Sequence, residues 1–274
     1  MAEPDPVPSG VDVSVPNLAR VYDFLLGGKD NFAADREAAA VALGTVPQMR
    51  WLAQANRGFL SRAVRFCAEA GIRQFVDIGA GLPTQDNVHQ VAQRADPGAH
   101  VVYVDNDAVV VSHGRALLAE DERTAVIEGD LLRPEGILGS DRLHALIDLD
   151  QPVALLVVAV LHFIPDGAGP AAAVARLRDA LAPGSFLILS HTEFPPEHAV
   201  GTERRSDETR ALSRTYGRQQ MGPARSRAEI AEFFGDFELL EPGLTEVWNW
   251  RPAGESVTNP SDVVTVVGGV ARKH

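Results

Sequence analysis

The 274-residue sequence lacks several features that define whole classes of protein. Its single cysteine excludes a disulfide within the chain and a cysteine metal cluster. No apolar run reaches the ~18 residues that a membrane-spanning helix needs. The N-terminal stretch is acidic and proline-rich and lacks the basic and then apolar pattern of a signal peptide. We therefore expect a cytoplasmic protein without a metal site or a membrane association.

Positive charge is also scarce. Lys and Arg number 25 against 37 Asp and Glu, which gives a formal net charge of −12. A nucleic-acid-binding protein needs a basic surface to displace counterions from phosphates. Seven arginines do gather late in the chain, but acidic residues among them favour a solvated helix face. They are Arg204, Arg205, Arg210, Arg214, Arg218, Arg225 and Arg227. The balance favours a small-molecule or protein partner over DNA or RNA and leaves the oligomeric state open.

The pattern of apolar residues divides the chain into three parts. Residues 1–13 are rich in Pro, Gly and Asp, which is typical of a disordered tail. Residues 14–71 predict three helices: one capped by Asn17 and ending at Gly27-Gly28, one over 33–43 and one over 47–70. Cys67 falls on the apolar stripe of the third helix, where a buried structural thiol is expected. Residues 72–274 form the main domain.

Strands and helices alternate from residue 73 onwards. Strands are expected at 74–78, 101–105, 124–128, 152–158 and 184–190, and helices near 84–95, 107–120 and 168–181. Apolar, β-branched strands in this alternation predict an α/β fold with a mostly parallel sheet covered on both faces. A helical insertion near 196–225, a helix at 226–234 and strand-like pieces at 237–241, 245–250 and 263–268 follow. Ligands of such sheets bind beyond the carboxyl ends of the strands.

The first two strands of the sheet end in a pattern that suits a nucleoside. The first carries Asp77 and stops at the turn Gly79-Ala80-Gly81, and the second ends at Asp105-Asn106. Glycines at the first turn let a ligand approach the backbone, and a carboxylate on the next strand holds a ribose diol. An ordinary strand–turn–helix is the alternative interpretation.

The third strand ends at Gly129-Asp130-Leu131. A carboxylate there can accept a hydrogen bond from an adenine amino group, and Leu131 can contact the ring. Because Asp also favours turns and caps, a purely local role for Asp130 stays open.

The turn after the first strand helps to choose between cofactors. Thr84 stands where the dinucleotide fingerprint G-x-G-x-x-G has its third glycine, and Pro83 offers no N–H to a pyrophosphate. S-adenosylmethionine has an adenine, a ribose and a cationic sulfonium but no phosphate, so it suits this turn. An NAD-dependent oxidoreductase is the less favoured alternative.

Longer segments of the chain resemble one protein family. The motifs are D-I-G-A-G-L-P-T at 77–84, V-Y-V-D-N-D at 102–107, E-G-D-L at 128–131 and V-L-H-F-I-P at 160–165, together with the unusual run S-V-P-N-L-A-R-V-Y-D-F-L-L-G-G-K-D-N-F-A-A-D at 14–35. In these segments the sequence resembles a bacterial family of S-adenosyl methyltransferases, once classed as a domain of unknown function. The resemblance spans roughly residues 14–270.

The resemblance implies a class I, Rossmann-like, doubly wound fold. Its seven-stranded sheet is mostly parallel, with an antiparallel C-terminal hairpin and an N-terminal helical extension. It also implies S-adenosylmethionine binding and transfer of its methyl group, here to an unidentified, small-molecule acceptor. A catalytically silent S-adenosylmethionine-binding or regulatory protein stays open as an alternative. Methyltransferases often close the cofactor site at the end of the fourth strand, here Ala159 and Val160.

The residues for catalysis are less sharply indicated. His162 follows the fourth strand, where an acceptor is expected, and is the first candidate for a general base, although a lone histidine is more often structural. Tyr22 is a second candidate. Tyr22, Gly28 and Asn31 surround the glycine break after the first helix, where they are candidates for contact with the methionine part of the cofactor. We expect this segment to form a lid, with a plain helix stop as the alternative.

Overall fold

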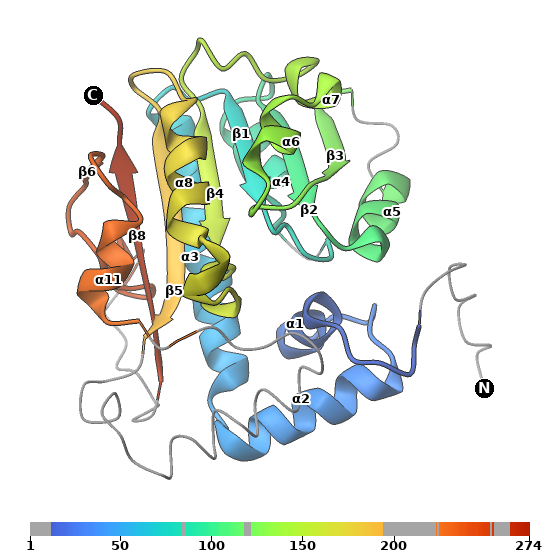
Figure 1. Ribbon diagram of the computed structural model, residues 1–274. Coiled ribbons are helices and arrows are strands. Elements are labelled where there is room, and N and C mark those ends of the chain that lie inside the picture. Colours follow the sequence, from blue (N-terminus) through green and yellow to red (C-terminus); the bar gives the residue numbers. More distant parts are fainter. Residues whose placement is uncertain are drawn as a thin grey trace.

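A computed structural model describes residues 12–83, 86–117, 122–193, 223, 225–252, 254 and 264–274. Figure 1 shows a central twisted sheet with helices on both faces and two N-terminal helices beyond one end of its strands. The strand order is β3-β2-β1-β4-β5-β8-β6, and β7 also pairs with β8. β1 to β5 are mutually parallel, whereas β8 runs antiparallel to β5, β6 and β7. The expected doubly wound α/β sheet with an antiparallel C-terminal part is thus confirmed.

The strands are β1 Gln74–Ile78, β2 His100–Asp105, β3 Thr124–Glu128, β4 Ala154–Val158, β5 Phe186–Glu193, β6 Glu238–Leu239, β7 Thr245–Glu246 and β8 Thr265–Arg272. The helices are α1 Leu18–Leu26, α2 Ala33–Thr45, α3 Met49–Glu69, α4 Val88–Ala95, α5 Ala108–Leu117, α6 Pro134–Leu138, α7 Asp141–His144, α8 Pro170–Asp179 and α11 Arg227–Glu232. Two 3₁₀ turns, η1 Leu161–Phe163 and η2 Asp166–Ala168, follow β4. None of the helices in these ranges is long and apolar enough to cross a membrane.

The two faces of the sheet bury alternate residues of the same strands. In β1, Phe75 packs into a cluster with residues of α3 and α4, whereas Val76 and Ile78 pack into the cluster that includes α8 and α11. Because successive side chains of a strand point to opposite faces, two helical layers require strands that are apolar at nearly every position. β4 meets this requirement, because all five of its residues are apolar and the first four are buried.

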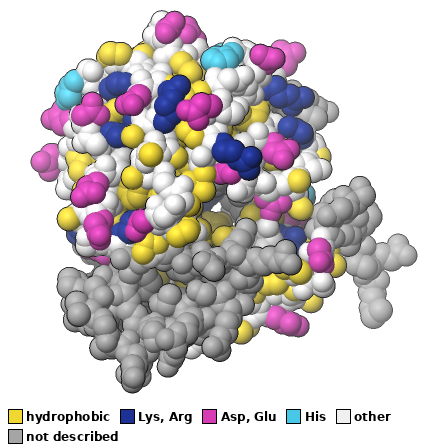
Figure 2. Space-filling model, viewed as in Figure 1, with side chains coloured by type: hydrophobic (Ala, Val, Ile, Leu, Met, Phe, Trp, Pro, Cys, Tyr) yellow, Lys and Arg dark blue, Asp and Glu magenta, His cyan; other side chains and the backbone are white. Residues whose placement is uncertain are grey.

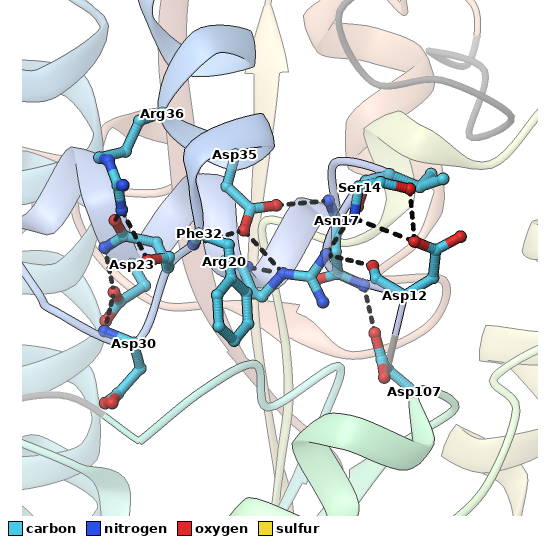
Figure 3. Close-up of polar contacts among 12 residues, drawn as sticks. Asp12, Ser14, Asn17, Arg20, Asp23, Asp30, Phe32, Asp35, Arg36 and Asp107 are labelled. Atoms are coloured by element: carbon cyan, nitrogen blue, oxygen red, sulfur yellow. Dashed lines mark hydrogen bonds and ion pairs between the residues drawn. The ribbon is translucent and has the colours of Figure 1, made fainter. Parts of the chain in front are cut away.

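The N-terminal helices have a small core of their own. Val21 and Leu25 of α1 pack with alanines of α2 and with Ala53 of α3. Beside this core, the buried Asp35 accepts hydrogen bonds from Arg20 Nε at 2.8 Å, from Phe32 N at 2.8 Å and from Asn17 N at 2.9 Å (Figure 3). One carboxylate therefore ties the start of α1 to the start of α2.

Local signals in the sequence predicted several of these details. Asn17 caps α1 by accepting from Arg20 N, and Gly27 ends the helix with φ +83°. Cys67 is fully buried, and burial raises the pKa of its thiol. The short helices α6 and α7 were not expected, and β8 is longer than predicted. Residues 1–11 of the expected tail, Thr84 and most of the expected insertion at 196–225 lie outside the described residues.

Candidate cofactor and methyl-transfer site

A cavity of about 510 Å³ lies between the carboxyl ends of the parallel strands and helix α1. Residues at or just beyond the ends of β1, β2, β3 and β4 form one wall. Asn17 and most residues of α1, with Asn56, Arg57 and Leu60 of α3, form the other. In Figure 2 a hollow bordered by hydrophobic side chains opens on this face of the molecule. The site thus lies where parallel α/β sheets bind their ligands.

The turn after β1 depends on two glycines with left-handed backbone conformations. Gly79 has φ +73° and Gly81 has φ +65°, both of which strain residues with a side chain. A Cβ atom on Gly79 would also overlap the Val160 side chain. At Gly81 a Cβ would meet nothing within 4 Å, so this part of the turn borders open space. Ala80 lines the same cavity.

Asp105 ends β2 with its carboxylate held by backbone amides. Gly81 N donates to Oδ2 and Asp107 N to Oδ1, both at 2.9 Å. Burial raises the pKa of Asp105, and these two bonds act in the opposite direction. Each carboxylate oxygen keeps a further acceptor lone pair, so a fixed carboxylate can receive the two hydroxyls of a ribose.

Asp77 is another buried carboxylate of the cavity and is only 5% exposed. Burial raises its pKa to about 7, with a further increase from Asp105 and a decrease from Arg57. A carboxylate under such a desolvation penalty gains strongly from a cationic ligand. The part of the cavity wall around Asp77 therefore favours a ligand with a positive charge.

The ends of β2 and β3 supply the remaining predicted cofactor residues. Asn106, Asp130 and Leu131 all line the cavity. The Asp130 carboxylate accepts from Leu132 N at 2.9 Å and pairs with Arg133 at 3.3 Å. Asp130 thus has the local role in a turn that the sequence left open, and it also lies on the cavity wall.

The N-terminal candidates separate into two groups. Tyr22 lines the cavity, and its hydroxyl donates to Ala53 O at 3.2 Å and accepts from Asn56 Nδ2 at 3.0 Å. Burial raises the pKa of Tyr22, which opposes its use as a base. Gly28 and Asn31 are not among the lining residues. They pack on Asp23 instead: Asn31 donates to its carboxylate at 2.9 Å, and a side chain on Gly28 would overlap that carboxylate.

The end of β4 brings Ala159 and Val160 to the cavity but not His162. Ala159 has φ +59°, an uncommon value for a residue with a side chain. The turn η1 then points Phe163 to the cavity and buries His162 beside His191, with the ring centroids 5.5 Å apart. Burial, with His191 and Arg225 adding to it, holds the pKa of His162 well below its usual value.

Arg225 holds the loop after β4 in place. Its buried guanidinium donates to the carbonyl oxygens of Leu161 and Ile164, and it pairs with Asp166 at 2.6 Å. It also donates to His191 Nε2 at 2.9 Å. The expectation that Arg225 belongs to a solvated basic face is therefore wrong, because this residue is only 4% exposed.

Five polar residues of the cavity were not predicted as site residues from the sequence: Asn17, Asp23, Asn56, Arg57 and Asp107. Asn56 carried a usable signal, because it interrupts the apolar stripe of α3 between Leu52 and Phe59. Asp107 was visible as the second carboxylate of the D-N-D motif. It caps α5 by accepting from Val109 N at 2.7 Å and also accepts a hydrogen bond from Asn17 Nδ2.

The fold and the cavity define a Rossmann-like, nucleoside-binding α/β protein. A model of the S-adenosyl methyltransferase family matches residues 5–274, and the chain belongs to this family. It is a methyltransferase that uses S-adenosylmethionine as its cofactor. The chain is therefore not assigned to the NAD-dependent oxidoreductases, which the sequence had left as a less favoured alternative.

Solved structures agree with this assignment. A candidate methyltransferase from Thermobifida fusca YX is 44% identical, with 97% of this chain and 98% of that chain covered and a TM-score of 0.86. A protein of the family DUF574 from Streptomyces avermitilis MA-4680 is 39% identical, with 96% and 99% covered and a TM-score of 0.85. An O-methyltransferase family protein from Burkholderia thailandensis shares the fold at 13% identity, with 88% and 60% covered and a TM-score of 0.52. A comparison with curated proteins found no match.

The residues around the cavity fit this cofactor. The two left-handed glycines leave room beside the turn after β1, and the fixed Asp105 offers acceptors for a diol. The buried Asp77 favours the positive charge of the sulfonium and ammonium groups. S-adenosylmethionine supplies an already activated methyl group when bound.

Proposed function

We propose that this methyltransferase acts on a small-molecule acceptor without negative charge, bound beside the cofactor in the cavity under α1. The ionisable side chains among the described lining residues support this choice. Besides Tyr22, they are Asp23, Arg57, Asp77, Asp105, Asp107 and Asp130. Five carboxylates and one guanidinium disfavour an acidic acceptor, because burying like charges together is costly.

The apolar part of the cavity supports the same choice. Leu25 and Leu26 of α1 line it on one side, and Phe163, Ile164 and Pro165 of the loop after β4 line it on the other. Apolar walls with a few polar groups are usual for sites that hold small organic molecules. The chain would orient the acceptor and exclude water, and these contributions alone account for much of the rate when the methyl donor is already activated.

The single observation that carries the cofactor assignment is the amide-held Asp105 beside the glycine turn. In our proposal it binds the ribose, Asp130 and Leu131 receive the adenine, and Asn106 lies between them. Asp77 with Gly79, Ala80 and Gly81 faces the methionine part, and Tyr22, Ala159 and Val160 close the site. His162 and Tyr22 were candidate bases, but His162 lies off the cavity wall and the Tyr22 hydroxyl is already hydrogen-bonded.

Asp105→Ala is expected to weaken S-adenosylmethionine binding by roughly 1–3 kcal/mol, because a hydrogen bond to a charged group contributes about this much. Titration calorimetry measures the effect directly. Asp150→Ala, which removes an exposed carboxylate from the loop after α7, is the matched control and should bind like the unchanged protein. Equal affinities for the Asp105 variant and the control would contradict the assignment.

The acceptor class can be tested with methyl-labelled S-adenosylmethionine and a cell extract divided on an anion exchanger. We expect labelled product from the small molecules that the exchanger does not retain. Asp105→Ala protein should label much less of the same material. Label confined to the retained, acidic molecules or to protein would refute the proposed acceptor class while leaving the cofactor site intact.

A further inference from the structure

Helix α1 and the turn after β4 are joined by a buried chain of hydrogen bonds. Ala159 N donates to Ser190 Oγ at 3.0 Å, and Ser190 Oγ donates to Asn56 Oδ1 at 2.7 Å. Asn56 Nδ2 then donates to the Tyr22 hydroxyl at 3.0 Å, which donates to Ala53 O at 3.2 Å. Every group donates in the same direction, so each bond polarises the next.

This chain of hydrogen bonds includes polar side chains at deeply buried positions. Ser190 is fully buried in β5 and Asn56 is 4% exposed on the buried side of α3. Buried polar groups are costly unless hydrogen-bonded, and here each one satisfies the next. An apolar pair would fill this space without such a requirement, so the polar residues point to a role in geometry.

One end of the chain reaches the cofactor wall. Ala159 holds its unusual φ of +59° while its N–H is fixed between Ser190 Oγ and Ser190 O, the latter at 3.2 Å. The next residue, Val160, packs against Gly79 so closely that a side chain there would overlap it. The turn after β4 thereby sets the position of the glycine turn after β1. At the other end, Tyr22 belongs to α1, the opposite wall of the cavity.

We infer that Asn56 and Ser190 are positioning residues that make the docking of α1, through Tyr22, set the shape of the cofactor site at Ala159 and Val160. The N-terminal helix is then part of the binding site and not only a cover. This inference rests on the proposed place of the cofactor in the cavity. It predicts that loss of the Tyr22 hydroxyl is felt at Ala159, although the two residues lie on opposite walls.

The test is a double-mutant cycle on S-adenosylmethionine affinity, measured by titration calorimetry. Tyr22→Phe and Ser190→Ala each interrupt the chain, and each should weaken binding about fivefold, the effect of one hydrogen bond. The double variant should also bind only about fivefold more weakly than the unchanged protein, because either change alone already breaks the chain of hydrogen bonds. The amide resonance of Ala159 in NMR spectra should shift in Tyr22→Phe.

Tyr103→Phe is the matched control. It removes one tyrosine hydroxyl, which accepts a hydrogen bond from His89 N at 2.9 Å, and Tyr103 is not among the residues that line the cavity. It should lower the thermal midpoint and leave the affinity and the Ala159 resonance unchanged. Multiplying losses in the double variant, or an unchanged Ala159 resonance in Tyr22→Phe, would overturn the inference. Normal binding by Asp105→Ala would instead show that the cofactor site is misplaced. Failure of the proposed site can therefore be told apart from failure of this inference.

Discussion

Asp77→Asn is expected to stabilise the ligand-free protein at pH 8. The folded state raises the pKa of Asp77 from 3.8 to about 7 through burial, so the folded protein binds this proton more tightly than the unfolded chain does. Stability from this group is therefore lost as pH rises from about 4 to 7, and the loss is complete above that range. Asparagine does not ionise, so the variant should avoid a cost on the order of 4 kcal/mol at pH 8.

The measurement is urea unfolding without cofactor at several pH values. The gain in the variant should grow between pH 5 and 7 and stay constant above, whereas Asp150→Asn, an exposed control, should follow the unchanged protein. A gain that is the same at pH 5 and pH 8 would show that the buried charge is not its cause.

The same substitution should weaken cofactor binding. An ionised Asp77 attracts a cationic ligand, so the affinity of the unchanged protein for S-adenosylmethionine should rise between pH 6 and 8, with a proton released on binding. In Asp77→Asn both the rise and the proton release should disappear, which calorimetry in buffers of different ionisation heat would show. Stability and affinity thus move in opposite directions, as expected for a charge retained for function.

The parts of the site that the sequence predicted are those encoded by neighbours along the chain. A strand that ends in Asp105, two glycines in a short turn and the cap Asn17 are local patterns, and each stands where it was expected. The sheet edge then brings the strand ends together without further information, because parallel strands share one direction. Asp77, Asp105 and Asp130 accordingly reach one cavity.

The chain of hydrogen bonds around Asn56 could not be predicted, because its partners lie far apart in sequence. Asn56 contacts Tyr22 at a separation of 34 residues and Ser190 at 134, so no local pattern reveals the chain of hydrogen bonds. His162 was expected beside the acceptor, but in the 3₁₀ turn η1 it is Phe163 that lines the cavity. Asn31 was expected at the cofactor, but the carboxylate of Asp23 takes its amide.

Asp35→Ala is expected to release the N-terminal helices from the rest of the molecule. Asp35 is fully buried and its two oxygens satisfy Arg20 Nε and the backbone amides of Asn17 and Phe32. Removing one partner of a buried ion pair leaves the other charge uncompensated and costs about 3–5 kcal/mol. Arg20 would keep the carbonyl oxygen of Val15 at 2.7 Å, which does not neutralise its charge.

Hydrogen exchange followed by mass spectrometry locates this loss. Peptides from α1 and α2 should exchange at least about a hundredfold faster, in keeping with the cost of the unpaired charge. Peptides from β1, β4 and β5 should change little, because the cores of the sheet do not include these helices. Asp86→Ala, which breaks the exposed pair with Arg94 at 2.6 Å, is the control and should cost at most about 1 kcal/mol.

The double variant Arg20→Met with Asp35→Leu separates charge from packing. Replacing both partners leaves no buried charge, so protection of α1 should return in part, although the amides of Asn17 and Phe32 still lack their acceptor. S-adenosylmethionine affinity should fall in Asp35→Ala and recover in the double variant, because Asn17 and Tyr22 line the cavity only while α1 is docked. A protein that loses protection in α1 yet binds the cofactor normally would show that the site is complete without its N-terminal wall.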